Sequence, residues 1–226
     1  WGDPTVTKSI LVNGIEVQVA VNLEAALRRI REAHEDVIIW VDALCINQSD
    51  IHERNTQVTR MREIYSRARL VYAWLGEDTN VTAEAVFQHM SKVSSHFGSQ
   101  IEEMENFFDE FPKYIKSDLG QKARNSIIES YHAGVLSVSE ALWKNLSEFT
   151  QRPYWQRMWI QQELLLPHKV SLLCGKFSVS LRDFIVWNES SWQYIYNEPS
   201  NFRGSDAVSS TNFVLLRICL LYTSLM

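Results

Sequence analysis

Apolar and polar residues alternate with two different periods near the start of this chain. Residues 5–20 alternate around Asn13-Gly14, a pair typical of a tight β-hairpin because both turn positions need a positive φ. Between residues 22 and 33, apolar residues recur on one helical face behind Asn22, which predicts a helix capped by that side chain. We therefore expect a hairpin followed by an amphipathic helix.

Two continuous apolar runs, residues 37–41 and 70–75, predict strands that are covered on both faces, as in a parallel sheet flanked by helices. A helical pattern over residues 53–67 lies between them. Strand, helix and strand in this spacing predict a βαβ unit with a right-handed crossover. The fold class expected is α/β.

The remainder of the chain predicts mostly helices. Residues 98–136 have weaker periodicity and an acidic patch, and we interpret them as a helical insertion. Ser137 and Glu140 have the spacing of a capping box. The other elements expected are helices over about 82–95, 140–149, 153–166 and 181–196, and strands over 170–174 and 177–180.

Composition limits the class of protein. The 226 residues are 46% apolar, enough for one core, and the net charge of −5 argues against a nucleic-acid-binding face. We find no apolar run long enough for a membrane span and no signal peptide, so a cytoplasmic location is expected. The three cysteines are widely spaced, which favours reduced thiols over a zinc site. The chain opens without Met and ends in apolar residues, so we expect a fragment.

The first apolar run stops at a group of polar side chains. Asp42 follows it directly, at the kind of position where ligands and catalytic groups collect in open α/β sheets. Cys45 is close to this acid, but an apolar-flanked thiol is usually a small core residue, so we expect it to pack. Asn47 and Gln48 are expected to bind backbone groups and shape the loop. Arg54, on the following helix, can face the same crevice.

A second candidate site lies in the helix predicted over residues 153–166. Trp155, Trp159 and Glu163 are spaced by four residues and would share one face, which places a carboxylate beside two indoles. Buried carboxylates often do acid–base or charge-stabilising work. Two interpretations stay open: a functional carboxylate, or one that pairs with an arginine to hold helices together. The candidate arginines are Arg54, Arg152 and Arg157.

Four segments make the chain similar to the fungal heterokaryon-incompatibility (HET) domain. They are Trp1-Gly2-Asp3-Pro4, residues 40–48 (WVDALCINQ), residues 57–76, and residues 152–163 with an Arg-x-Trp-x-x-Gln-Glu block. The resemblance covers about residues 1–185. It implies a HET domain over 1–185, truncated at its amino end and carrying the insertion of about 98–136, followed by an incomplete carboxy-terminal extension over 186–226.

The resemblance implies non-self recognition and regulated cell death in filamentous fungi. It also implies a distant relation to TIR domains, and hence a flavodoxin-like, mostly parallel sheet. Several TIR domains cleave NAD with the glutamate of a Trp-x-x-x-Glu helix, and Trp159 to Glu163 has that spacing. The implied roles are Glu163 as the catalytic residue and Asp42, Trp159 and Arg54 as binders of the substrate NAD, without a metal or other cofactor.

Three functions stay open at this point. The first is an NAD glycohydrolase, active on self-association, in which Glu163 stabilises the positive charge that develops on the ribose. The second is a non-enzymatic module that assembles with other death-signalling proteins or with itself. The third is an inactive, truncated paralogue. A carboxylate engaged by an arginine would favour a structural role for Glu163.

Overall fold

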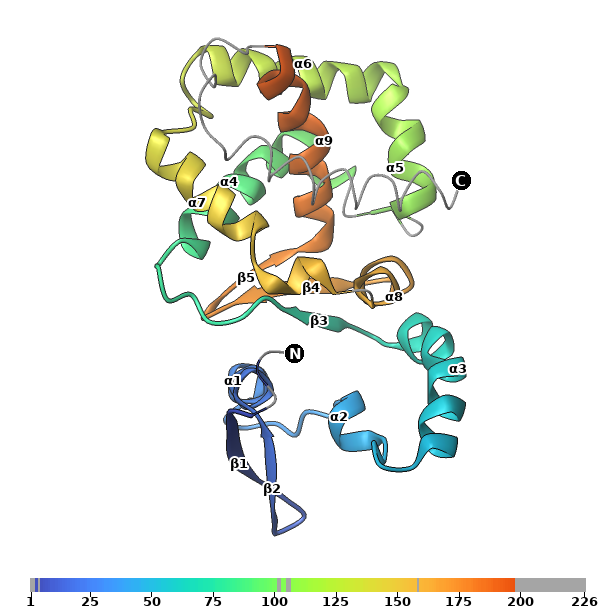
Figure 1. Ribbon diagram of the computed structural model, residues 1–226. Coiled ribbons are helices and arrows are strands. Elements are labelled where there is room, and N and C mark those ends of the chain that lie inside the picture. The colour runs from blue at the N-terminus through green and yellow to red at the C-terminus, as the bar shows by residue number, and fades with distance from the viewer. Residues whose placement is uncertain (1–2, 4, 101–102, 105–106, 158, 198–226) are drawn as a thin grey trace.

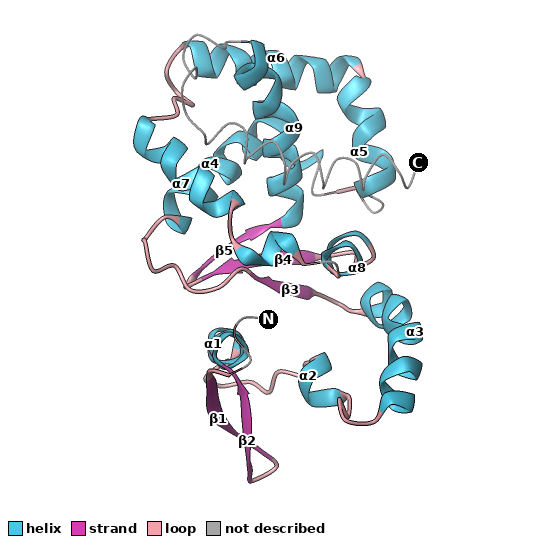
Figure 2. Ribbon diagram, viewed as in Figure 1, coloured by secondary structure: helices cyan, strands magenta, loops and turns pink. Residues whose placement is uncertain are grey.

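The protein has a mixed α/β structure in which helices predominate (Figures 1 and 2). The computed structural model describes residues 3, 5–100, 103–104, 107–157 and 159–197. The strands are β1 (Thr7–Val12), β2 (Ile15–Ala20), β3 (Val71–Trp74), β4 (Val170–Cys174) and β5 (Phe177–Ser180). The helices are α1 (Val21–Ile30), α2 (Asp42–Cys45), α3 (Ile51–Arg67), α4 (Ala83–Ser94), α5 (Phe107–Lys116), α6 (Asp118–His132), α7 (Glu140–Thr150), α8 (Ile160–Leu165) and α9 (Leu181–Asn197), with 3₁₀ helices η1 (Ser95–Gln100) and η2 (Pro153–Gln156).

The amino-terminal hairpin forms as predicted. β1 and β2 pair antiparallel, and Asn13 and Gly14 between them have φ angles of 52° and 78°. The Lys8 Nζ on β1 lies 3.1 Å from a carboxylate oxygen of Glu24 on α1, which ties the hairpin to the helix that follows. α1 begins earlier than expected, so Asn22 lies in its first turn and is not the cap.

A three-stranded sheet of order β3-β4-β5 lies at the centre of the fold. β3 and β4 are parallel, with Val71 opposite Val170 and Trp74 opposite Leu173, whereas β4 and β5 are antiparallel. The three strands confirm the predicted elements. The sheet itself is mixed, which corrects the prediction of a mostly parallel sheet, because a tight turn after β4 returns the chain directly alongside it.

Helices cover both faces of this sheet, and Figure 1 shows α1 on the opposite side from α4, α7 and α9. On one face, Ala73 and Leu172 are wholly buried in the main core, to which α4 to α9 contribute. On the other face, Trp74 and Leu173 pack against Ala26 of α1. Successive residues of each strand therefore serve two different layers.

Residues 98–136 are largely helical, as predicted, and they complete the main core. Phe107, Phe111 and Ile115 of α5 and Ile127 and Tyr131 of α6 are all buried in it. The rings of Phe107 and Phe111 are stacked, with centroids 4.9 Å apart. The insertion is therefore part of the folded unit rather than an appendage to it.

The first apolar run is not a strand, which corrects the sequence prediction. Residues 37–41 connect α1 to α2 without regular secondary structure, and Ile38 is completely exposed, at 101%. A strand needs a main-chain partner, and no strand in the described part of the chain lies beside this segment. The predicted βαβ unit is consequently missing its first strand, whereas α3 and β3 form as expected.

The division of the chain near residue 185 stays a prediction. Residues 198–226 lie outside the described residues, as do Trp1, Gly2 and Pro4 of the opening motif. Where the structure can be described, none of its helices is long and apolar enough to cross a membrane.

Candidate functional site

The segment from Trp155 to Glu163 is not the single helix predicted. Arg157, after η2, has extended backbone (φ −72°, ψ 142°), and α8 starts beyond it. Trp155 is buried, with its ring stacked on Phe184 at 5.5 Å, whereas Trp159 is 42% exposed. The two indoles and Glu163 therefore do not share one face. With this bend, Trp155 lies in the main core.

The Glu163 carboxylate is buried, and both of its oxygens are occupied. The Arg157 guanidinium lies 3.1 Å from Oε1 and donates to Oε2 at 3.3 Å, while the Tyr154 hydroxyl donates to Oε2 at 2.8 Å. Burial raises the pKa of Tyr154, and the charge of Glu163 raises it further, so the phenol keeps its proton. This forked pairing corresponds to the arginine-bound interpretation, with Arg157 as the partner.

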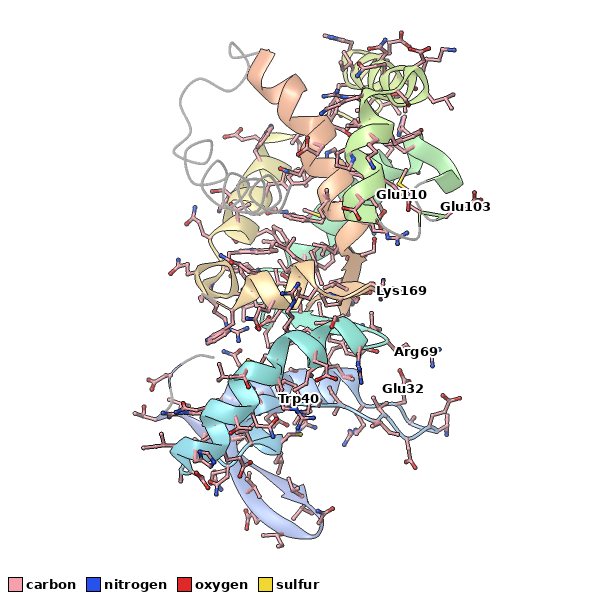
Figure 3. All side chains as sticks on the ribbon, turned by 90° about the vertical axis from the view of Figure 1, so that its right-hand side faces the viewer. Glu32, Trp40, Arg69, Glu103, Glu110 and Lys169 are labelled. Atoms are coloured by element: carbon pink, nitrogen blue, oxygen red, sulfur yellow. The ribbon has the colours of Figure 1, made fainter. Side chains whose placement is uncertain are left out.

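Tyr65 of α3 connects Glu163 with the first candidate site. Its ring packs edge-on against Trp40, with centroids 6.2 Å apart, and Figure 3 shows Trp40 beside α3. Burial raises the pKa of the Tyr65 hydroxyl, and the charges of Glu163 and Asp42 raise it further. The two predicted acids therefore both raise the pKa of the same phenol. We call the set Asp42, Tyr65, Tyr154, Arg157 and Glu163 the Tyr65 cluster.

The polar residues after the first apolar run shape a loop, as predicted for Asn47 and Gln48. Gln48 Nε2 donates to the carbonyl of Asp42 at 2.9 Å, and Asn47 Oδ1 accepts from the N–H of Ser49 at 3.1 Å. The carboxylate of Asp42 accepts from the N–H of Ala43 at 2.7 Å and is exposed. Asp42 is thus accessible to a ligand, whereas the two amides are engaged with the backbone.

Two other sequence candidates lie apart from the Tyr65 cluster. Cys45 is exposed, which corrects the expectation that it packs in the core. Arg54 is exposed on α3, and among the described residues its side chain has no hydrogen-bond or ion-pair partner. The charges of Asp42 and Glu163 both reach the Tyr65 hydroxyl, whereas no interaction joins Arg54 to either acid. The functional roles assigned to Asp42, Trp159, Arg54 and Glu163 stay predictions.

A second arginine–carboxylate pair, not anticipated from the sequence, lies at the carboxyl end of β3. Arg152 lies 3.4 Å from Asp78, and the two side chains are 14% and 7% exposed. Arg152 also donates to the carbonyl of Leu75 at 3.3 Å. The Asp78 carboxylate accepts from the N–H of Thr82 at 2.9 Å and from that of Ala83, so it binds the amino end of α4, where the Thr82 side chain makes no capping hydrogen bond. The sequence signal was present, because Asp78 closely follows an apolar strand.

Both arginine pairs lie within the part of the chain that matches a known family. Residues 1–163 match the family described as heterokaryon incompatibility protein (HET), and the match ends at Glu163. The chain belongs to the HET family. It is 28% identical over 196 residues to "Heterokaryon incompatibility protein 6, OR allele" of Neurospora crassa, an alignment that covers 80% of this chain and 28% of that protein. The chain therefore spans well under half of that relative's length. No solved structure matches it.

The geometry of this HET domain limits what the Tyr65 cluster can do chemically. Arg157 neutralises Glu163, so the carboxylate as it stands offers little charge to a developing cation. Asp42 is the exposed acid of the cluster and can accept a hydrogen bond from a ligand. Across the described residues, no group of His, Cys, Asp and Glu side chains is arranged to hold a metal ion.

Proposed function

We propose that this HET domain acts in non-self recognition and regulated cell death by assembling with other death-signalling proteins or with itself. The family match and the name of the Neurospora relative support the biological role. The observation that carries the non-enzymatic mode of action is the state of Glu163. Its two carboxylate oxygens are taken by Arg157 and Tyr154, which hold η2 against α8.

The surface of the domain supports the same proposal. Val37, Ile38 and Ile39 are consecutive apolar residues, and each is at least 38% exposed. A contiguous apolar patch on a folded domain commonly marks a contact with another protein. A cluster that anchors helices and a patch that can bind a partner together suit an interaction module better than an enzyme.

A specific observation favours a second candidate, an NAD glycohydrolase related to the TIR domains and their flavodoxin-like sheet. Asp42 and Glu163, the acids of two of the matching segments, both raise the pKa of the Tyr65 hydroxyl, so the charge of each reaches that hydroxyl. In this candidate, Glu163 faces the ribosyl cation after release from Arg157, and Asp42 contacts the ribose. Exposed Trp159 and Arg54 are accessible for binding NAD.

NAD consumption by the purified chain separates the two candidates. We expect no loss of NAD at low or high protein concentration, because Glu163 is neutralised by Arg157. Loss of NAD that disappears in Glu163→Gln would overturn the non-enzymatic proposal and establish the second candidate. Glu129→Gln, at an exposed position on α6, is the control for removal of one surface charge.

Cell viability after induced expression in a fungal host provides an independent test. Asp42→Asn alters an exposed carboxylate with little expected effect on folding. We expect cell death with Asp42→Asn to equal that of the unaltered chain. Equal expression without cell death in Asp42→Asn, but not in Glu129→Gln, would contradict assembly as the mode of action.

A further inference from the structure

β3 leaves one edge of the sheet open. The amides of Val71 and Leu75 donate to main-chain carbonyls on the β4 side, at 3.0 and 2.8 Å. Because successive amides of a strand point in opposite directions, those of Tyr72 and Trp74 point away from β4. Among the described residues, no hydrogen-bond acceptor reaches these two amides. β3 also lacks the proline or charge that often protects such an edge.

The segment Val37–Val41 has the properties of a strand that could occupy this edge. Each of its residues is β-branched or aromatic, and its last residue is already extended (φ −136°, ψ 119°). Its first three residues expose apolar surface that a neighbouring strand would cover. α3, with 17 residues, lies between this segment and β3 and has the length that a crossover between parallel strands requires.

We propose that Val37–Val41 is a strap that closes onto the free edge of β3 of the same molecule as a parallel strand. The structure holds the strap open. In the closed form Val41 lies beside Trp74 and Ile39 beside Tyr72, with a right-handed connection through α3. The strap is tethered to β3 through its own chain, which gives it a higher effective concentration at that edge than a strand of another molecule has.

The position of Trp40 determines the register of the closed strap. Trp40 contacts Tyr65, whose ring packs against the main core, and Ala73 of β3 faces the same core. With Trp40 beside Ala73, the indole stays on the core side and Ile39 faces the α1 side together with Tyr72. A slip of one residue would move every side chain of the strap to the wrong face.

Closure would move Asp42 to the carboxyl edge of the sheet. With Val41 beside Trp74, Asp42 lies level with Leu75, whose carbonyl accepts from Arg152, and so close to the Arg152–Asp78 pair that holds the end of β3. Closure would also cover the apolar patch used for assembly. The strap would therefore hide the patch when closed and expose it when open. That role rests on the proposed function, whereas closure itself does not.

A pair of introduced cysteines tests closure in the full chain, in a background with Cys45→Ser and Cys219→Ser. Ile39→Cys with Tyr72→Cys places two thiols within disulfide range if the strap closes in the proposed register. We expect mild oxidation to give a cross-linked monomer. Ile38→Cys with Tyr72→Cys is the matched control, because its thiols then point to opposite faces and cross-link at least about tenfold less.

The outcomes distinguish the alternatives. Absence of a cross-link, or equal cross-linking in the control pair, overturns the proposal. A cross-linked dimer also overturns it, because the edge then takes the strand of a second copy.

Hydrogen exchange gives a second readout on the chain with its own cysteines. We expect the Tyr72 and Trp74 amides to exchange more than about tenfold slower than in Ile39→Pro, with β4 protected equally in both chains. Equal rates at Tyr72 and Trp74 would contradict closure. Because these tests use neither NAD nor cell death, their failure is separable from failure of the proposed function.

Discussion

The two apolar runs on either side of α3 have similar sequences and opposite surroundings. In the second run, Ala73 is wholly buried and Leu75 is 1% exposed, whereas Ile38 in the first run is completely exposed. An acid follows each run, yet Asp78 is paired with Arg152 and Asp42 remains exposed. An apolar sequence therefore creates a tendency toward burial, and a hydrogen-bonding neighbour decides whether the segment is buried.

The largest expected difference is in stability. Leu75→Ala should lower the free energy of unfolding by about 2 to 5 kcal/mol, because it leaves a cavity in the main core. Leu11→Ala, at a position on the hairpin that is 77% exposed, should change it by less than about 0.5 kcal/mol. Urea unfolding measures both. Val37→Ala tests the first run directly, and a loss as large as that of Leu75→Ala would show that this run is buried in solution.

The acid at the end of each run gives the next comparison. Arg152→Met leaves Asp78 without its cation at a site that is largely buried, and should cost about 3 kcal/mol. Arg54→Met, on the helix after Asp42, removes an exposed arginine and should cost less than about 0.5 kcal/mol. Thermal or urea unfolding of the two variants provides the measurement. Equal costs would mean that Arg152 contributes little to holding the end of β3.

The pH dependence of stability should come in part from a buried histidine on the helix that packs over the sheet. Burial lowers the pKa of His89 on α4 from 6.5 to about 4, and the nearby charge of Lys92 adds to this. The unfolded chain therefore binds a proton that the folded chain excludes, and stability falls as pH decreases from about 6.5 to about 4. The expected loss is about 2 to 3 kcal/mol.

Urea unfolding of the unaltered chain and of His89→Gln at several pH values measures this loss. The difference between the two chains isolates the histidine from the carboxylates that titrate in the same range. A difference that does not change between pH 7 and pH 4.5 would contradict the assignment.

The smallest expected difference in the free energy of unfolding is between two glycine-to-alanine changes. Gly175 follows β4 with φ of 52°, and a Cβ there would lie 2.9 Å from the Cβ of Asp78. Gly14 in the hairpin has φ of 78° and nothing within 4 Å of the same position. Both changes to Ala cost about 1 kcal/mol of backbone strain, and Gly175→Ala should cost about 1 to 2 kcal/mol more. Equal costs would show that Asp78 moves freely.

The sequence predicts those parts of the fold that depend on local chemistry. The hairpin follows from the turn residues Asn13 and Gly14, and α3 and β3 to β5 follow from their periodicity. The roles of Asn47 and Gln48 in the loop follow from short polar side chains next to free backbone groups. In each case the interacting groups are close in sequence, so a single segment contains the information.

The rest depends on partners that are distant in sequence. Nothing near Trp155 indicates that its ring stacks on Phe184, yet that contact accompanies the bend at Arg157 and separates Trp159 from Glu163. The first apolar run satisfies every local criterion for a strand and lacks only a neighbour. The same limit applies to the site, because Tyr65 of α3 feels the charge of Glu163 of α8 only through the packing of these two distant helices.

Cys174 gives this domain an intrinsic reporter of the opening of its sheet. It ends β4 wholly buried, and burial raises the pKa of its thiol to about 12. Cys45, within residues 40–48, is exposed. Because alkylating reagents attack the thiolate, Cys174 reacts when the strands separate. The rate at which Cys174 is alkylated, relative to the rate for Cys45, therefore reports how often the strands separate. Cys45 provides the rate for a thiol that the reagent reaches without any opening, and no introduced label is needed.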